Sequence, residues 1–280
     1  MRWLGGRSSN NVEDRRGKSG GIAIGGGIGT VVIVIILSLI TGKNPMDYLN
    51  SDAANQQQTE YTPSPEEEQD AKFVSVVLAE TEDVWKKLFD EQLHKEYIDP
   101  KLVLFTGSNQ SGCGFASAAT GPFYCPSDSR VYIDLSFYDE LKDKFKAPGD
   151  FAMAYVIAHE VGHHVQHLLH ISDRVHEQQN QLDEKGANDL SVRLELQADY
   201  FAGVWAHYIQ RKNILEEGDV EEALNAANAI GDDRLQKQAQ GYVVPDAFTH
   251  GTSEQRMRWF KKGFDSGLIK DGDTFNSPNL

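Results

Sequence analysis

The longest uninterrupted apolar stretch of this 280-residue chain lies near its N-terminus, at residues 21–40 (GIAIGGGIGTVVIVIILSLI). The stretch contains no charged residue, and about 20 apolar residues in a helix span the hydrocarbon core of a bilayer. The residues before it carry several positive charges, at Arg2, Arg7, Arg15, Arg16 and Lys18. Because basic flanks tend to remain in the cytoplasm, we expect a basic cytoplasmic segment at residues 1–20 and one transmembrane helix at residues 21–41.

A cleaved signal peptide is the alternative for this stretch. Its apolar region is usually about 7–15 residues long and ends at a small-residue cleavage site. The run here is longer, and no A-x-A pattern follows it. A membrane anchor is therefore favoured, and either interpretation exports the rest of the chain. We expect a single-pass membrane protein with a cytoplasmic N-terminus and the rest of the chain on the other side.

Three glycines in the apolar stretch, Gly21, Gly25 and Gly29, have the small-xxx-small spacing with which transmembrane helices can pair. The spacing allows a homo-oligomer through the anchor. Glycines that face lipid without a partner would show the same spacing, so both interpretations stay open.

Beyond the apolar stretch the chain divides into a linker and one domain. Residues 42–70 are polar and acidic, a composition that cannot form a core. A helical period of apolar positions then begins near Asp70 and runs to about Tyr97. The later pattern predicts strands at 101–106 and 131–138, and helices at 151–170 and 191–211. A separate last helix is expected to end at about Gly263. We expect a helix-dominated α+β domain with a small sheet over residues 71–280.

Charge and cysteine content narrow the class of protein further. The formal net charge is −15, and no basic cluster typical of nucleic-acid binding is evident in the main body, so we exclude nucleic acid as a partner. The two cysteines, Cys113 and Cys125, lie in a Gly/Ser/Pro-rich stretch. Their spacing favours a disulfide in an oxidising compartment, and two free buried thiols are the alternative.

The segment AYVIAHEVGHHVQHLLH carries the candidate chemistry. On a helix, His159 and His163 lie one turn apart on the same face, so both imidazoles can bind one Zn²⁺ ion. Glu160 is rotated by about 100° from His159, which places its carboxylate beside the metal, where a general base for a water molecule belongs. This HExxH pattern indicates a zinc peptidase, and an ordinary helix with surface histidines is the alternative.

A catalytic zinc usually has a third protein ligand. The metzincin pattern would require Gly and His where this chain has Gln166 and Leu169, so it is excluded. His167 lies about 12 Å along the helix axis from His159 and cannot share its metal ion. His164 and His170 are off the metal-facing stripe, and we interpret all three as surface or outer-layer residues.

The segment SVRLELQADYFAGVWAHYIQ offers a better third ligand, Glu195. Asp199 lies one turn later on the same face, where it could accept a hydrogen bond from the nitrogen of His159 that does not bind metal. A solvated acidic face is the alternative for this pair. Apolar residues surround the pair and leave only a narrow part of the helix surface to face solvent, which argues against that alternative. These residues are Leu194, Leu196, Phe201, Val204 and Trp205.

Five separated blocks of the chain resemble the bacterial "putative neutral zinc metallopeptidase" family. They are MRWLGGRSSNNVEDRRG, CGFASAATGPFYCPSDSRVYID, AHEVGHHVQ, LELQADYFAGVWAH and FTHGTSEQR. The resemblance implies a single-pass anchor in the bacterial inner membrane with a cytoplasmic N-terminus and a periplasmic catalytic domain. It also implies a zincin-like fold and the gluzincin pattern of HExxH with a downstream Glu. It implies that His159, His163 and Glu195 are the zinc ligands and that Glu160 is the general base.

The block FTHGTSEQR is similar to the H-P-x-x-x-x-R element of membrane zinc peptidases of the Ste24/HtpX type, with Gly251 in place of proline. This similarity implies that His250 or Arg256 stabilises the developing oxyanion. Alternatively, His250 precedes a helix cap and Arg256 pairs with an acidic residue such as Asp199 or Glu254.

In zincins an edge strand before the active-site helix binds the substrate backbone. The segment 131–138 is our candidate for that strand.

Together these features predict a membrane-anchored, zinc-dependent endopeptidase that acts on proteins or peptides. The alternative is a non-catalytic, membrane-tethered scaffold with a structural zinc site. Structural zinc is usually closed by four protein ligands, often cysteines. Neither cysteine lies near the histidines in the sequence, which favours an open catalytic site.

Overall fold

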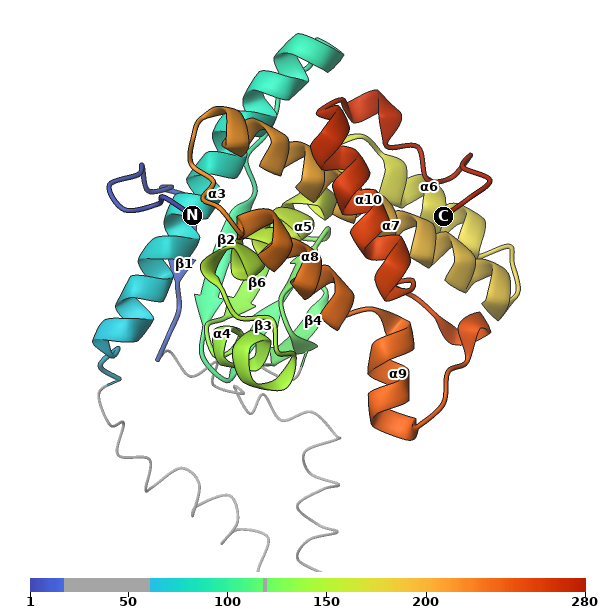
Figure 1. Ribbon diagram of the computed structural model, residues 1–280, viewed down its shortest axis with the longest axis horizontal. Coiled ribbons are helices and arrows are strands. Elements are labelled where there is room, and N and C mark those ends of the chain that lie inside the picture. The colour runs from blue at the N-terminus through green and yellow to red at the C-terminus, as the bar shows by residue number, and fades with distance from the viewer. Residues whose placement is uncertain (18–60, 118–119) are drawn as a thin grey trace, which may run out of the picture.

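A computed structural model describes residues 1–17, 61–117 and 120–280 (Figure 1). Over these residues the chain is a helix-dominated α+β protein with a small sheet, as the apolar pattern predicted. The expected transmembrane helix at 21–41, its glycines and most of the linker at 42–70 lie outside these ranges. Within the ranges, no helix combines the length and apolarity that crossing a membrane requires.

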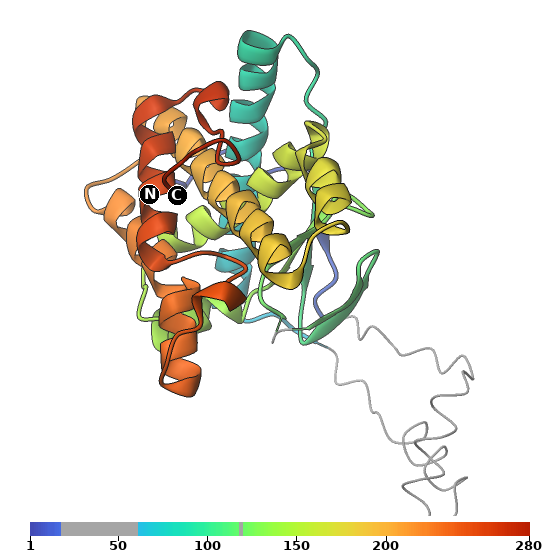
Figure 2. The ribbon, with the colours of Figure 1, turned by 90° about the vertical axis from the view of Figure 1, so that its right-hand side faces the viewer.

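The sheet has four strands in the order β1-β2-β6-β5, and it lies on one flank of the helices (Figures 1 and 2). The bounds are β1 (Val12–Asp14), β2 (Lys101–Phe105), β6 (Arg130–Asp134) and β5 (Phe123–Cys125). β1, β2 and β6 are parallel, and β5 runs antiparallel to β6. A separate hairpin joins β3 (Ser108–Ser111) to β4 (Gly114–Ser117).

Residues 1–17 belong to the same domain as the rest of the described chain. Val12 pairs with Leu102 in the sheet, and the buried carboxylate of Glu82 accepts hydrogen bonds from Ser9, Asn11 and Arg7. The sequence predicts a separate segment at 1–20, whereas in the structure residues 1–17 are part of the domain through β1. The side of a membrane on which they lie stays a prediction.

The helices surround α5 (Asp150–Leu168), which is buried along most of its length. The longest neighbours are α3 (Pro65–Leu88) and α7 (Glu184–Arg211). α3 begins with a capping box between Ser64 and Glu67 and continues into a π-helical turn, η1 (Phe89–Leu93). The remaining elements are α4 (Phe137–Asp139), η3 (Glu140–Lys144), α6 (Ile171–Gln179), α8 (Asp219–Ala229), α9 (Asp232–Gln240), η4 (Pro245–Ala247), α10 (Ser253–Ser266) and η5 (Ile269–Asp271).

Small residues let α7 approach its neighbours closely. A Cβ atom at position 162 of α5 would lie 2.9 Å from the carbonyl oxygen of Ala198, and one at position 263 of α10 would lie 2.0 Å from that of Tyr200. Only glycine permits backbone contacts this close. The three helices therefore meet around Asp199, which is fully buried.

The segment 131–138 differs from its prediction as an edge strand. Its strand ends at Asp134, the helical turn α4 begins at Phe137, and β6 lies between β2 and β5 inside the sheet. β5 forms the edge instead, because its antiparallel pairing covers the free side of β6. The predicted disulfide between Cys113 and Cys125 is present and ties the β3–β4 hairpin to β5.

Candidate metal centre

Three predicted ligand side chains meet where α5 crosses α7. The Nε2 atom of His159 lies 3.1 Å from Oε2 of Glu195, and the Nε2 atom of His163 lies 3.4 Å from Oε1 of the same carboxylate. The histidines are one helical turn apart, as their spacing requires. Their side chains are 8 and 16 % exposed, and that of Glu195 is 18 % exposed, so the cluster is shielded but accessible.

These atoms fit a tetrahedral zinc ion. Nitrogen and oxygen ligands at about 2.0–2.2 Å from Zn²⁺ lie about 3.3–3.6 Å from one another, close to the two separations between Glu195 and the histidines. Two imidazoles and one carboxylate also match the donor set of catalytic zinc sites. The residues that would hold the ion are therefore His159, His163 and Glu195, which gather as a possible metal-binding group.

Buried hydrogen bonds fix the side of His159 that faces away from the metal position. Its Nδ1 atom lies 2.8 Å from Oδ1 of Asp199, so Nδ1–H donates to the carboxylate and Nε2 is directed toward Glu195. The hydroxyl of Tyr155 donates to the same oxygen at 2.5 Å. Arg256 donates to both oxygens of Asp199, from Nε at 2.8 Å and from Nη2 at 3.0 Å.

The carboxylates around the cluster favour positive charge. Burial opposes ionisation of Glu195, but the two histidines hold the pKa of its carboxyl well below the usual range. Burial lowers the pKa of His159, but Asp199 and Glu195 outweigh burial and raise that pKa to about 10. Positive charge is therefore stabilised between these side chains.

Glu160 lies beside the ligands rather than among them. Its side chain is buried and lines the cleft described below. Burial raises the pKa of Glu160, while the neighbouring histidines and a hydrogen bond from the backbone of Tyr124 act in the opposite direction. A carboxylate with a raised pKa, next to the metal position, suits proton transfer near neutral pH.

The extra histidines of α5 attach the edge strand β5 to this helix. The hydroxyl of Tyr124 lies 2.9 Å from Nδ1 of His164 and 2.7 Å from Nδ1 of His167. Nε2 of His164 donates to the carbonyl oxygen of Ile98 at 2.7 Å. His164 is buried, which lowers its pKa to about 4. This role cannot be read from the sequence, because Tyr124 lies about 40 residues from His164 in the chain.

A cleft with a volume of about 580 Å³ opens over the metal cluster. β5 and the loop before it form one wall. α9 and the loop that carries His250 contribute to the opposite side. The residues that line the cleft near its centre are Phe123, Tyr124, His159, Glu160, His163, Glu195 and His250. The volume is that of a site for a small molecule or several residues of a peptide.

The two candidates for oxyanion stabilisation differ in their surroundings. Arg256 is 2 % exposed, and its donors are directed to Asp199 and Tyr155, which matches the structural alternative raised from the sequence. The side chain of His250 is half-exposed at the cleft, and its Nδ1 atom lies 3.3 Å from Oδ1 of Asp232. This hydrogen bond raises the pKa of His250.

Comparisons with known proteins identify the family of this chain. The family model described as "Putative neutral zinc metallopeptidase" matches residues 1–275. The chain is 54% identical to Uncharacterized protein YpfJ of Escherichia coli (strain K12), over 98% of this chain and 99% of that protein. It is 41% identical to Uncharacterized protein Rv2575 of Mycobacterium tuberculosis, over 70% of this chain and 68% of the relative. No solved structure is significantly similar.

Proposed function

Since the chain belongs to the "putative neutral zinc metallopeptidase" family, we propose that it is a zinc-dependent endopeptidase that hydrolyses peptide bonds in proteins or peptides. The observation that carries the proposal is the convergence of His159, His163 and Glu195 on one point at the floor of an open cleft. Glu160 lines the same cleft without joining the ligand cluster.

Each residue of the site has a distinct role in this reaction. Zn²⁺, when bound, supplies a Lewis acid that polarises the scissile carbonyl and lowers the pKa of water. The carboxylate of Glu160 accepts a proton from the attacking water and delivers it to the leaving amine. His250 donates a hydrogen bond to the developing oxyanion from the cleft wall. Arg256 acts indirectly, because it fixes Asp199, which in turn orients His159.

The edge strand β5 is the natural partner for an extended substrate. One side of β5 pairs with β6, and residues 122–124 line the cleft. A peptide that adds to the free side would gain backbone hydrogen bonds. Tyr124 would then link substrate binding to catalysis, since its backbone also contacts Glu160.

The apolar stretch at residues 21–40 supports attachment to a membrane, with Cys113–Cys125 on the oxidising side. In this proposal residues 1–17 lie on the same side as the catalytic domain, because β1 is part of its sheet; the stretch therefore attaches the protein to the membrane without a single crossing from one compartment to the other. A structural zinc in a non-catalytic scaffold is less well supported. Such a site needs a fourth protein ligand, and the group among the described residues offers three.

The test compares Glu160→Gln with Glu195→Gln in the full-length protein. We expect Glu160→Gln to retain zinc and to lose at least about a thousandfold in kcat/KM on casein-derived peptides, and Glu195→Gln to bind zinc more weakly. Glu96→Gln, at an exposed position, is the control and should match wild type. Peptide hydrolysis at the wild-type rate by zinc-loaded Glu160→Gln would refute the proposal.

A further inference from the structure

A second recess adjoins the catalytic cleft between η3 and α9. It has a volume of about 430 Å³ and is lined by Lys144, Lys146, Arg234, Lys237 and Gln238. We call these five residues the basic groove. Lys144 lines both the basic groove and the cleft, so the two recesses are neighbours.

The basic groove concentrates positive charge in an acidic protein. The chain has a formal net charge of −15, yet four of the five groove residues are cationic and none is acidic. Lys144 forms an exposed ion pair with Glu140. Lys146, Arg234 and Lys237 form no ion pair with a carboxylate of the described chain. Their charges are therefore available to a ligand.

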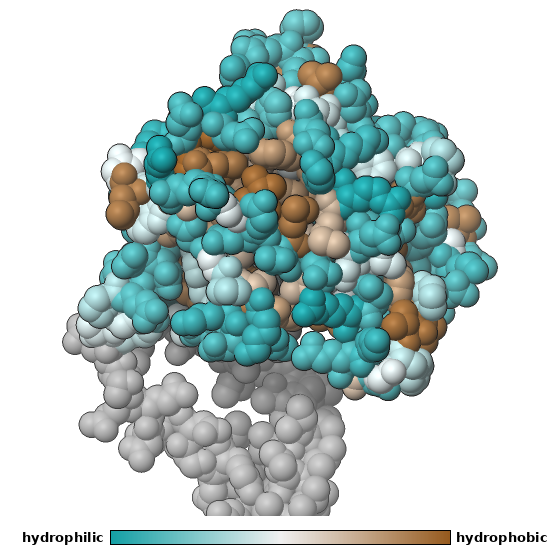
Figure 3. Space-filling view, viewed as in Figure 1, coloured by the Kyte–Doolittle hydropathy of each residue, from teal (hydrophilic) through white to brown (hydrophobic). Residues whose placement is uncertain are grey.

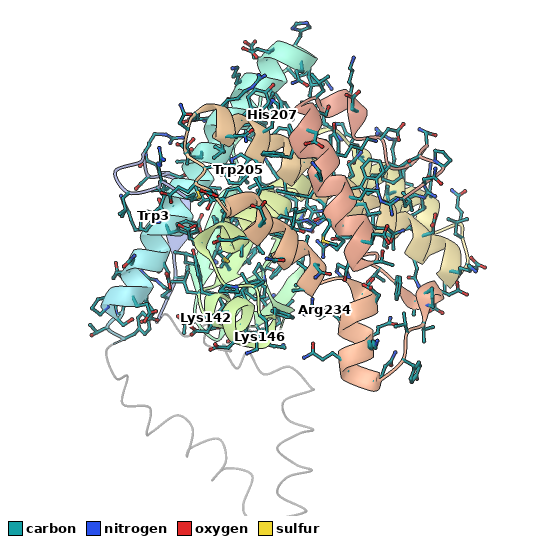
Figure 4. The ribbon with its side chains drawn as sticks, viewed as in Figure 1. Trp3, Lys142, Lys146, Trp205, His207 and Arg234 are labelled. Carbon is teal, nitrogen blue, oxygen red and sulfur yellow. A yellow bond between two sulfur atoms is a disulfide. The ribbon has the colours of Figure 1, made fainter. Side chains whose placement is uncertain are left out.

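The fold creates this cluster from two distant segments. Arg234 and Lys237 are three residues apart on α9 and share a face of that helix. Lys144 and Lys146 come from the end of η3, about 90 residues earlier. Figure 4 shows Lys142, Lys146 and Arg234 along the lower part of the molecule, and Figure 3 shows a largely hydrophilic surface there. The sequence analysis found no basic cluster because neither segment alone is strongly basic.

The catalytic cleft is partly lined by apolar side chains. Its side chains include Phe137, Phe145, Val156, Ile230 and Leu235. Val156 lies one helical turn before Glu160 on α5. Phe145 and Leu235 belong to the same two segments that carry the groove cations. Because these two residues neighbour the groove cations in the chain, an apolar part of the cleft adjoins the basic groove.

We propose that the basic groove binds acidic residues of the peptide substrate, beyond a bulky apolar side chain that occupies the adjoining part of the cleft. This inference rests on the proposed peptidase function and adds a substrate class to it. Carboxylates entering the groove would meet four cations at the edge of a low-dielectric cleft. Charge complementarity of this kind mainly increases the association rate and the selectivity for one class of partner.

The geometry favours a peptide over an anionic lipid surface. The cations line a recess and converge from two elements, whereas a flat bilayer is best contacted by residues that project from one face. The exposed apolar residues near α9, which would insert into lipid, are Tyr242, Val243 and Val244 beyond its C-terminal end. None of these three lines the basic groove.

The test uses fluorogenic peptides with one central leucine or phenylalanine and a tail of four Glu, four Gln or four Lys, placed before or after the core. At low salt we expect full-length wild-type enzyme to cleave one of the Glu-tailed peptides about tenfold faster in kcat/KM than its Gln-tailed match. The Lys-tailed peptide should be cleaved most slowly. These differences should shrink in about 0.5 M NaCl, where exposed charges are screened.

Charge-reversal variants show whether the basic groove causes the preference for Glu-tailed peptides. The double variant Arg234→Glu/Lys237→Glu should lose the preference for Glu tails and still cleave Gln-tailed peptides. Lys95→Glu/Arg211→Glu changes the same charge at exposed positions outside both recesses and should behave as wild type. Binding of labelled peptides to Glu160→Gln, with and without the groove substitutions, is measured in parallel by fluorescence anisotropy.

The possible outcomes distinguish failure of the basic groove as a substrate site from failure of the proposed peptidase function. Equal cleavage of all tails by wild type would overturn the basic groove as a substrate site and leave the peptidase intact. Groove-dependent binding of Glu-tailed peptides without hydrolysis of any peptide would support the groove and refute the peptidase. If the groove variant instead loses only its binding to vesicles of phosphatidylglycerol and phosphatidylcholine, the site is a lipid contact and our proposal is wrong.

Discussion

The side-chain oxygen Oε1 of Gln166 lies 2.9 Å from Nδ1 of His163, one turn earlier on α5. The amide nitrogen of Gln166 donates to the carbonyl oxygen of Leu194 at 2.7 Å and to Oε1 of Gln197 at 3.2 Å. These bonds fix the orientation of the Gln166 amide, so that Oε1 must accept from His163. The imidazole is thereby held with Nδ1 protonated and Nε2 free for a metal ion.

This relationship predicts the effect of replacing Gln166. We expect Gln166→Leu to weaken zinc binding about 10–100-fold, because partners of this kind orient the ligand and increase its basicity. Gln166→Glu keeps an acceptor for Nδ1 and should retain most of the affinity. Competition with a chromogenic chelator measures the dissociation constant, and Gln178→Leu at an exposed position is the matched control. Unchanged zinc affinity in Gln166→Leu would remove Gln166 from the site.

The sequence could predict which side chains gather at this centre but not the residues that support them. His159, His163, Glu195 and Asp199 follow helical spacing within two segments, and helical spacing is readable from sequence. Gln166 appeared only as a position that excludes the metzincin pattern. Its hydrogen-bond partners on α7 lie about 30 residues away, and no local pattern specifies which helices cross.

The fold, too, could be predicted only where a local sequence pattern specifies it. α5 and α10 were predicted close to their observed positions. For α7 the end at Arg211 was predicted correctly, but the helix begins at Glu184, seven residues before the predicted start. β1 was missed, because a three-residue strand has almost no pattern of its own and its partner β2 lies about 90 residues later. The short strand β5 was missed for the same reason, and the edge was assigned to the longer apolar segment that contains β6.

The buried pair of Arg256 and Asp199 should contribute strongly to stability. Arg256→Met leaves the Asp199 carboxylate buried without its main cation, which costs about 3–5 kcal/mol of unfolding free energy. The double variant Asp199→Asn/Arg256→Met should recover part of that loss, because it removes the uncompensated charge. Urea unfolding of the single and double variants gives both values. Additive losses in the double variant would argue against direct coupling of the two residues.

Attachment of residues 1–17 should depend on acidic pH. Burial opposes ionisation of Glu82 and Glu13, but hydrogen bonds from Ser9 and Asn11 lower the pKa of Glu82, and Arg15 and Lys101 lower that of Glu13 to about 2. Their folded pKa values lie below the unfolded ones, so their stabilising contribution is complete above about pH 4.5. It is lost as pH falls toward 2.

Hydrogen exchange of residues 1–17 between pH 5 and 2.5 provides the measurement, after correction for the intrinsic exchange rates. We expect the N-terminal amides to lose protection before those of α5. Glu82→Gln should already show low protection at pH 5 and a smaller change on acidification. Loss of protection at the same pH in β1 and α5 would mean that these carboxylates do not control docking of the N-terminal segment.

The pairing of β1 with β2 also predicts membrane sidedness. Asn10 and Lys95 are both exposed, and they belong to one domain, so cysteines placed at these positions should face the same compartment. In intact spheroplasts, a membrane-impermeant maleimide should label Asn10→Cys and Lys95→Cys to the same extent, and the two native cysteines should stay unlabelled in their disulfide. Permeabilised cells control for accessibility. Labelling of Lys95→Cys alone would mean that β1 leaves the sheet in the cell and that residues 1–17 lie across the membrane.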